Sequence, residues 1–356
     1  MKFPNFPHDR LTQIDLRRQD EPHKYSLVSP QDPESMRNLF TFALKAAISC
    51  VLLYFAFAHV NFDLIGRQLD HLKYGWLAAA VVVLIAQISL GALRWQRIVH
   101  RCNTPDEPPL TIANAFRYIF IAAFFNQTLP STVGGDAVRI WLLARDNGGW
   151  RSATHSVLID RMVGVLVLAF LVIFCLPWSF ALISDIAGRI ALLIVGFGCV
   201  GACFIFLALG FVRWRWLDRW WLTRQLVAAG SNARDVFGSA SSMAHIIAYS
   251  LIIHFISATA AWCLAKAVAA PLEWSQALLL VLPVLLIATV PLSIAGWGTR
   301  ETAMVLAFGY AGLPESDGLI VSLLFGIAMF AAGLPGGAIW ILDRGRRSRD
   351  ARQPAR

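Results

Sequence analysis

The sequence predicts an all-α polytopic membrane protein with about six full spans and two re-entrant elements in an inverted-topology repeat. Of its 356 residues, 57% are hydrophobic and only 15% are charged, whereas a soluble domain has about 25% charged residues. Several apolar runs reach the roughly 20 residues that a helix needs to cross a bilayer. These runs do not alternate as barrel strands do, so helices are expected.

The full spans are predicted from the long apolar runs, taken in chain order. They are 40–60, 76–93, 157–182, 190–212, 246–270 and 319–342. Two further apolar segments, 112–129 and 277–290, run into Gly/Pro-rich stretches instead of continuing as helices. We interpret these two as the re-entrant elements.

The distribution of basic residues predicts the topology. Lys and Arg are numerous in the polar tail 1–38, in the basic tail 343–356, and in the stretches 94–110, 131–155 and 213–244. If all five face the cytoplasm, as the positive-inside rule requires, the segment 112–130 must begin and end inside. By the same count of membrane crossings, the region 277–312 begins and ends outside. We therefore expect a plasma (bacterial inner) membrane protein with both termini cytoplasmic.

The two broken stretches resemble each other at an offset of 161 residues. The first motif, 126–139, includes TLPSTVGGDAVR, and the second motif, 289–301, includes TVPLSIAGWGTR. Shifting the spans of 39–182 by 161 places them on or near the spans of 183–342. Each half holds three full crossings, an odd number, so the second half is expected to lie inverted relative to the first.

Inverted repeats with Gly/Pro-interrupted segments predict a site near the bilayer midplane. The residues expected to shape the broken backbone are Pro130, Gly134, Gly135, Pro291, Ser293, Gly296, Trp297 and Gly298. The residues expected to bind substrate are Asn126, Asp136, Arg139, Asp160, Arg161, Arg300 and Glu301. Arginines beside a helix N-terminus suit an anion such as a phosphate. The alternative is structural: Asp136 and Arg139 would pair at the helix start, and Asp160 and Arg161 would pair with the broken loop.

Other classes of site have little support in the sequence. The basic residues follow membrane topology, so no nucleic-acid partner is expected. No CxxC or HExxH spacing occurs, and five of the six cysteines lie inside apolar runs, so neither a metal nor a cofactor is expected. No catalytic cluster is visible, and we do not expect an enzyme.

The combined motifs identify a family resemblance. The pattern N-x-x-x-P-x-x-x-G-G-D-x-x-R, a following D-R, and P-x-S-x-x-G-W-G-x-R-E resemble the flippase-like membrane region of lysylphosphatidylglycerol synthases over about residues 40–342. The resemblance implies movement of a lipid between leaflets. The chain ends fourteen residues after the last predicted span, so we expect no aminoacyl-transferring domain.

The predicted function is therefore that of a lipid translocase acting on a phospholipid or on a polyprenyl- or hopanoid-type lipid. The arginines of the two motifs predict a head group that is anionic or phosphate-bearing. The resemblance implies a lipid-modifying enzyme or glycosyltransferase as a partner. The alternative is a membrane-embedded transferase, or an accessory protein, of lipid-linked glycan or hopanoid synthesis.

Overall fold

The computed structural model describes residues 71–104, 107–129, 133–147, 149–183, 185–209, 240–290 and 298–350, together with residues 47, 51 and 54. All regular structure within these ranges is helical, as predicted. Several predicted features lie outside the described residues. They are the tail 1–38, nearly all of the 40–60 span, Pro130, Pro291, Ser293, Gly296, Trp297 and residues 351–356.

Five long helices coincide with five of the six predicted spans. They are α3 (Tyr74–Cys102), α6 (Trp150–Leu182), α7 (Ile186–Leu209), α9 (Ala240–Ala267) and α12 (Glu315–Asp350). Each contains a stretch long and apolar enough to cross a membrane, so the chain is a multi-pass membrane protein.

Most of these helices extend beyond the apolar runs that predicted them. With its 29 residues, α3 is about 44 Å long at 1.5 Å per residue, more than the hydrocarbon core requires. It continues through Arg94 and Arg101, and α6 begins seven residues before the predicted span at Val157. The first eight residues of the predicted basic tail, 343–350, are the end of α12.

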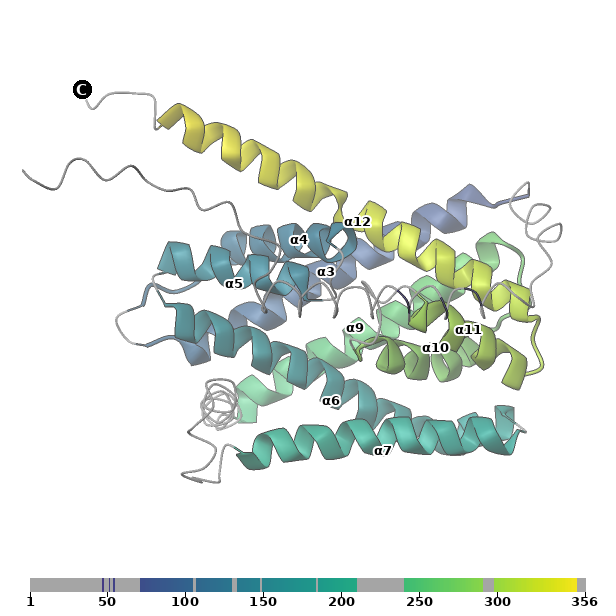
Figure 1. The fold of residues 1–356 in the computed structure, drawn as a ribbon. Helices are drawn as coiled ribbons and strands as arrows, with labels where there is room; N and C mark the ends of the chain where they lie inside the picture. The colour runs from purple at the N-terminus through teal and green to yellow at the C-terminus, as the bar shows by residue number, and fades with distance from the viewer. Residues whose placement is uncertain are drawn as a thin grey trace, which may run out of the picture. The chain divides into compact units, whose positions relative to one another are not determined.

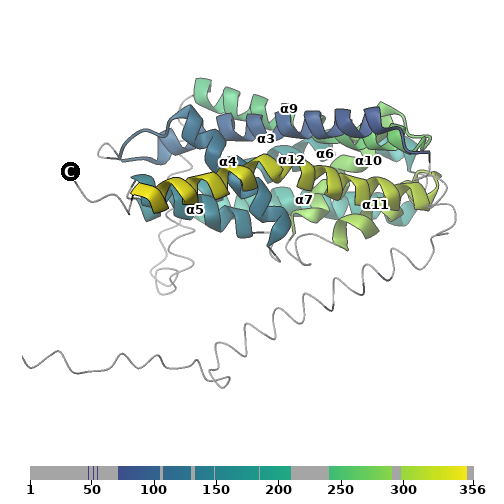
Figure 2. The ribbon, with the colours of Figure 1, turned by 90° about the horizontal axis from the view of Figure 1, so that it is seen from above.

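Four short helices form two pairs, one at each broken stretch. The first pair is α4 (Ile112–Thr128) and α5 (Gly134–Asn147), and the second is α10 (Trp274–Ala288) and α11 (Thr299–Tyr310). The helices of each pair pack against each other. In Figures 1 and 2 the two pairs extend from opposite ends of the helical bundle.

Hydrogen bonds at the helix ends define which pair belongs to which end. The amide of Lys73, before α3, donates to the carbonyl of Ala267, the last residue of α9, at 2.9 Å. Since Glu273 follows as the N-cap of α10, the second pair starts at this end. The opposite end holds the start of the first pair, because Gln96 of α3 donates to the carbonyl of Leu110, just before α4, at 3.1 Å.

The helices of the second half follow those of the first at a nearly constant spacing. Adding 161 to the first residues of α3, α4, α5 and α6 gives 235, 273, 295 and 311. The helices α9, α10, α11 and α12 begin at 240, 274, 299 and 315. Each helix thus begins one to five residues after the shifted position.

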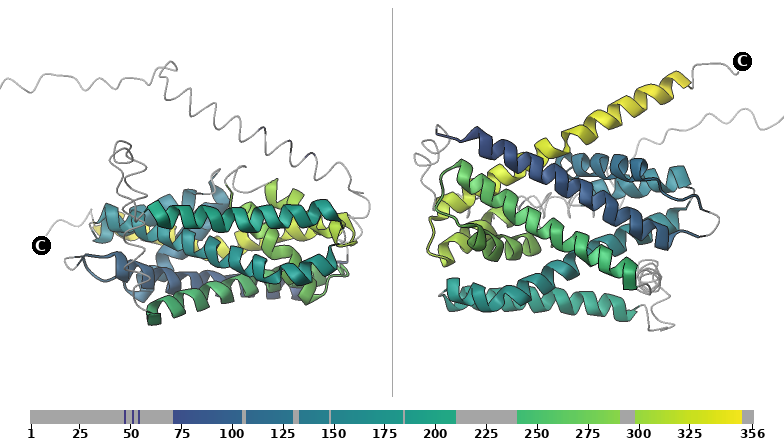
Figure 3. Two further views of the ribbon diagram at one scale, coloured as in Figure 1. Left: turned by 90° about the horizontal axis from the view of Figure 1, so that it is seen from below. Right: turned by 180° about the vertical axis from the view of Figure 1, so that it is seen from behind.

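The contacts between helices follow the same correspondence, in which α3, α4, α5 and α6 of the first half match α9, α10, α11 and α12 of the second half. Each contact below is paired with the contact between the matching helices. The helix α4 packs on α12, and α10 packs on α6; α3 packs on α4, and α9 packs on α10; α5 packs on α6, and α11 packs on α12. The helices α3 and α9, which exchange with each other, lie side by side in Figures 1 and 3.

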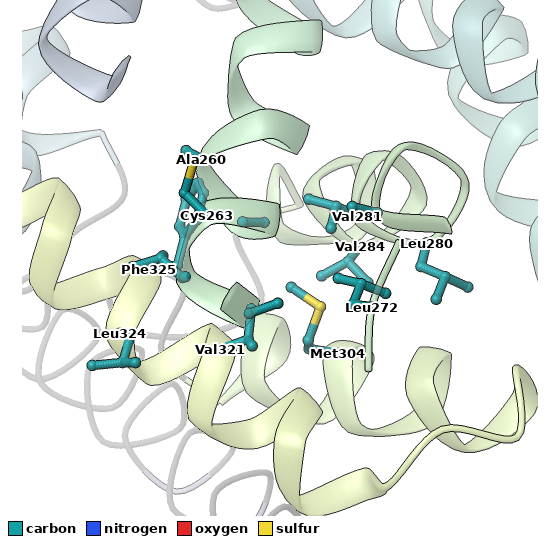
Figure 4. Close-up of a cluster of buried hydrophobic side chains, with 14 of the residues drawn as sticks. Ala260, Cys263, Leu272, Leu280, Val281, Val284, Met304, Val321, Leu324 and Phe325 are labelled. Carbon is teal, nitrogen blue, oxygen red and sulfur yellow. The ribbon is translucent and has the colours of Figure 1, made fainter. Parts of the chain in front are cut away.

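Buried apolar side chains hold the second pair against its neighbours. Met304 of α11 lies between Val284 of α10 and Val321 of α12, with Cys263 of α9 nearby (Figure 4). By contrast, α7 exposes large apolar side chains. Such a surface suits contact with hydrocarbon, where apolar exposure has no hydration cost.

Candidate functional site

The first broken stretch positions α5 through a glycine and an asparagine. The amide of Gly135 donates to Oδ1 of Asn126, on α4, at 2.9 Å. A Cβ at Gly135 would collide with the carbonyl oxygen of Ala122 and would lie 2.7 Å from the Asn126 carboxamide. At Gly134 a Cβ would lie 2.8 Å from the side chain of Leu129. Both glycines therefore permit the close approach of α5 to α4.

Asn126, predicted to bind substrate, thus also satisfies an amide at the start of α5. The first amides of a helix have no partner within the helix, and a side-chain oxygen commonly supplies one. The sequence had suggested that these amides point at a bound anion. In the structure the Gly135 amide is occupied by Asn126.

The charged residues of the first motif pair across two helices. Nη1 of Arg139, on α5, lies 2.9 Å from Oδ2 of Asp160, on α6, and its Nη2 lies 3.1 Å from Asp136. Arg161, on α6, donates to both carboxylate oxygens of Asp136, from Nε at 2.7 Å and from Nη2 at 3.0 Å. The four predicted residues therefore form one ion-pair network between α5 and α6.

A fifth member of this network was not among the predicted site residues. Nε of Arg94, on α3, lies 2.9 Å from Oδ1 of Asp160, and Nη1 of Arg94 donates to Ser250 of α9 at 3.1 Å. We name Arg94, Asp136, Arg139, Asp160 and Arg161 the charge network. The sequence offered one signal: Arg94 and Asp160 each lie at the end of an apolar run, on the same side of the predicted membrane.

Burial differs among the members of the charge network. The side chains of Asp136, Arg139 and Asp160 are 4–6% exposed, whereas that of Arg161 is 52% exposed. The Arg139 guanidinium lies over the ring of Trp95, 5.3 Å from its centroid. Its Nε is buried and has no hydrogen-bond partner among the described residues.

At the second broken stretch, the polar contacts of the described residues join Gly298, Arg300 and Glu301 to one another and to α12. The amide of Gly298, which has φ of +93°, donates to Oε2 of Glu301 at 2.7 Å. Nη2 of Arg300 donates to Oε1 of Glu301 at 2.7 Å, and its Nε donates to Ser322 of α12 at 3.1 Å. Glu301 is fully buried. It therefore caps the start of α11 and neutralises Arg300.

Among the described residues, the two motifs form separate sets of contacts. The charge network joins α3, α5, α6 and α9, whereas Arg300 and Glu301 contact each other and α12. Of the predicted site residues, the structure thus brings together Asp136, Arg139, Asp160 and Arg161 in one set and Arg300 and Glu301 in another. That all face one central cavity stays a prediction.

An apolar cavity of about 300 Å³ lies between α7, α10 and α11. Its lining includes Leu192 and Val195 of α7, Pro283 and Ile287 of α10, and Thr299 and Thr302 of α11. Because Pro283 lies inside α10, it cannot donate the usual backbone hydrogen bond there. No group of three His, Cys, Asp or Glu side chains suited to a metal occurs among the described residues.

The sequence model of the family described as "Lysylphosphatidylglycerol synthase TM region" matches residues 42–337. No curated protein matches the chain.

Proposed function

The chain belongs to the family of the lysylphosphatidylglycerol synthase transmembrane region, and we propose that it moves a phosphate-bearing lipid between membrane leaflets. The family name refers to the synthesis of a modified membrane phospholipid, which supports a membrane lipid as the substrate. The observation that carries the proposal is the charge network, which links the first broken stretch to α3, α6 and α9.

The helix arrangement supports an inverted repeat with re-entrant elements. In such a repeat, equivalent helices make equivalent contacts, and interrupted segments from opposite sides approach a central site. Three observations agree with this architecture. Matching helices of the two halves begin about 161 residues apart, matching helices make matching contacts, and the two short pairs start at opposite ends of the bundle. Alternating access then requires one half to rock against the other.

The basic residues support a cytoplasmic location for the end at which α4 starts. Arg97 and Arg101 lie in the last turns of α3. At the same end, Arg145 lies in the last turn of α5 and Arg151 lies in the first turn of α6. Short loops rich in Lys and Arg face the cytoplasm. We therefore assign the second pair, α10 and α11, to the outer side.

Two features of the site suit a lipid of this class. Arginines recognise phosphate oxygens through paired N–H donors, and the charge network supplies three arginines. The cavity between α7, α10 and α11 is lined mainly by apolar side chains and suits a hydrocarbon chain.

The test is a proteoliposome assay with head-group-labelled phospholipids and polyprenyl phosphate. Wild type is expected to accelerate leaflet exchange, whereas Arg139→Ala and Arg300→Ala are expected to reduce it to the level of empty vesicles. Arg151→Ala is the matched control, because it removes the same charge from an exposed position in the first turn of α6.

Each outcome of this assay has a defined consequence. Normal leaflet exchange by folded Arg139→Ala and Arg300→Ala would contradict the assignment of these arginines to the substrate site. Background exchange by wild type, combined with product formation from a sugar donor, would instead support the alternative of a membrane-embedded transferase.

A further inference from the structure

Arg161 holds Asp136 in the geometry with which arginine binds phosphate. Its Nε and Nη2 donate to the two carboxylate oxygens at 2.7 and 3.0 Å, so the two planar groups lie fork to fork. A phosphodiester also presents two free oxygens on one atom, and it can accept the same pair of donors. Since the Arg161 side chain is 52% exposed, this fork is within reach of a ligand.

The charge network carries an excess of positive charge. Three guanidinium groups face two carboxylates, and the two carboxylates and Arg139 are almost fully buried. The Arg161 side chain is the most exposed of the five, so a further anion can reach the network there and balance its charge. The buried Nε of Arg139, without a partner among the described residues, is a second sign that its donors are not all satisfied.

We propose that Asp136 is an internal anion, which the phosphate group of a lipid head group displaces from Arg161. This proposal rests on the proposed function and adds the binding step. The phosphodiester takes the two donors of Arg161, while Asp136 keeps its contact with Arg139. The network then holds three positive and three negative charges, and it is balanced.

The exchange also links binding to the position of α5. Two ion pairs join α5 to α6 in the structure: Asp136 with Arg161 and Arg139 with Asp160. Displacement of Asp136 breaks its ion pair with Arg161 and leaves the ion pair of Arg139 with Asp160 intact. Head-group binding therefore loosens the first broken stretch from α6, as a translocation cycle requires.

The experiment measures binding to the full chain, purified in detergent, with inorganic phosphate and dihexanoylphosphatidylglycerol as separate probes. Asp136→Asn removes the competing charge from Arg161, so both dissociation constants should fall by about tenfold, the effect of roughly 1.4 kcal/mol. Asp146→Asn is the matched control: it removes the same charge from α5 at a residue that pairs with Arg145, outside the charge network, and it should change the constants by less than about threefold.

Arg161 is tested by two further substitutions. Arg161→Gln should abolish the gain produced by Asp136→Asn when the two are combined, and Arg161→Lys should recover only part of it, because lysine lacks the fork. Thermal unfolding of each variant shows that folded protein is being compared.

Equal tightening by Asp136→Asn and Asp146→Asn would overturn the proposal, since net charge alone would then explain the effect. Unchanged or weaker binding by folded Asp136→Asn would overturn it as well. Tightening with phosphate but not with the lipid would assign the site to a free anion and overturn the lipid assignment. Leaflet exchange is measured separately, so a failure of translocation with the expected change in binding leaves the displacement intact.

Discussion

Gly135 shows how a single residue determines the approach of two helices. Its missing side chain lets the start of α5 lie against the carbonyl of Ala122 and the carboxamide of Asn126. The same approach brings Asp136 and Arg139 within reach of α6. A residue that looked like a helix breaker in the sequence therefore also positions the charge network.

Substitution of Gly135 should be destabilising, in contrast to an open glycine elsewhere. Gly135→Ala should lower the free energy of unfolding by about 1–3 kcal/mol, because its Cβ has no room. Gly91→Ala, inside α3 with nothing within 4 Å of its Cβ, should raise it by about 0.5–1 kcal/mol. Thermal unfolding in detergent measures both, and equal effects would contradict the assigned role.

At the scale of elements, α4 and α12 meet along a seam of small residues. A Cβ at Gly336 of α12 would overlap the carbonyl of Phe120 of α4, and a Cβ at Gly333 would lie 3.3 Å from the backbone of Phe124. An ion pair between Arg117 and Asp343 continues the seam. Small residues allow helices in a membrane to approach closely, and dispersion contacts then stabilise the pair.

The seam should fail when the small residue is enlarged. Gly336→Val should separate α4 from α12 and lower the free energy of unfolding by about 1–3 kcal/mol. Gly201→Val, in α7 where no atom lies within 4 Å of the added Cβ, should cost less than about 1 kcal/mol. If thermal unfolding shows that both variants lose the same free energy of unfolding, the seam does not stabilise the packing of α4 on α12.

At the scale of the whole molecule, the described helices run in alternating directions and support opposite entry of the two short pairs. The proposed topology assigns the start of α6 to the cytoplasm and the start of α10 to the outer side. This assignment rests on the basic residues at one end and on the directions of α3 and α9.

Cysteine labelling in intact cells tests this assignment. In a background without the six native cysteines, Glu273→Cys should react with an impermeant maleimide from outside. Arg151→Cys, exposed at the start of α6, should react only after the membrane is permeabilised. The reverse pattern would invert the topology, and labelling of both from outside would contradict the cytoplasmic position of the start of α6.

Apolar length, charge placement and helix breakers were sufficient to predict five described spans and two interrupted segments, and the residue pattern of the two motifs carried the resemblance to the family. These properties are local, because the bilayer imposes a minimum apolar length and an asymmetry of charge on each segment separately. The repeat offset of 161, read from two short motifs, also anticipated where the helices of the second half begin. That the halves are inverted, and that the short pairs are re-entrant, stays a prediction.

Only the tertiary structure decided which charges meet. The structural alternative drawn from the sequence, which pairs Asp136 with Arg139 and pairs Asp160 and Arg161 with the broken loop, is confirmed. The structure adds that Arg161 holds Asp136 fork to fork and that Arg94 joins the network from 66 positions away. Ion pairs between helices depend on the rotation and depth of each helix, which packing contacts such as that at Gly135 determine. The sequence thus determined which segments are apolar and long enough to enter the membrane, and packing determined which arginine of the charge network remains exposed.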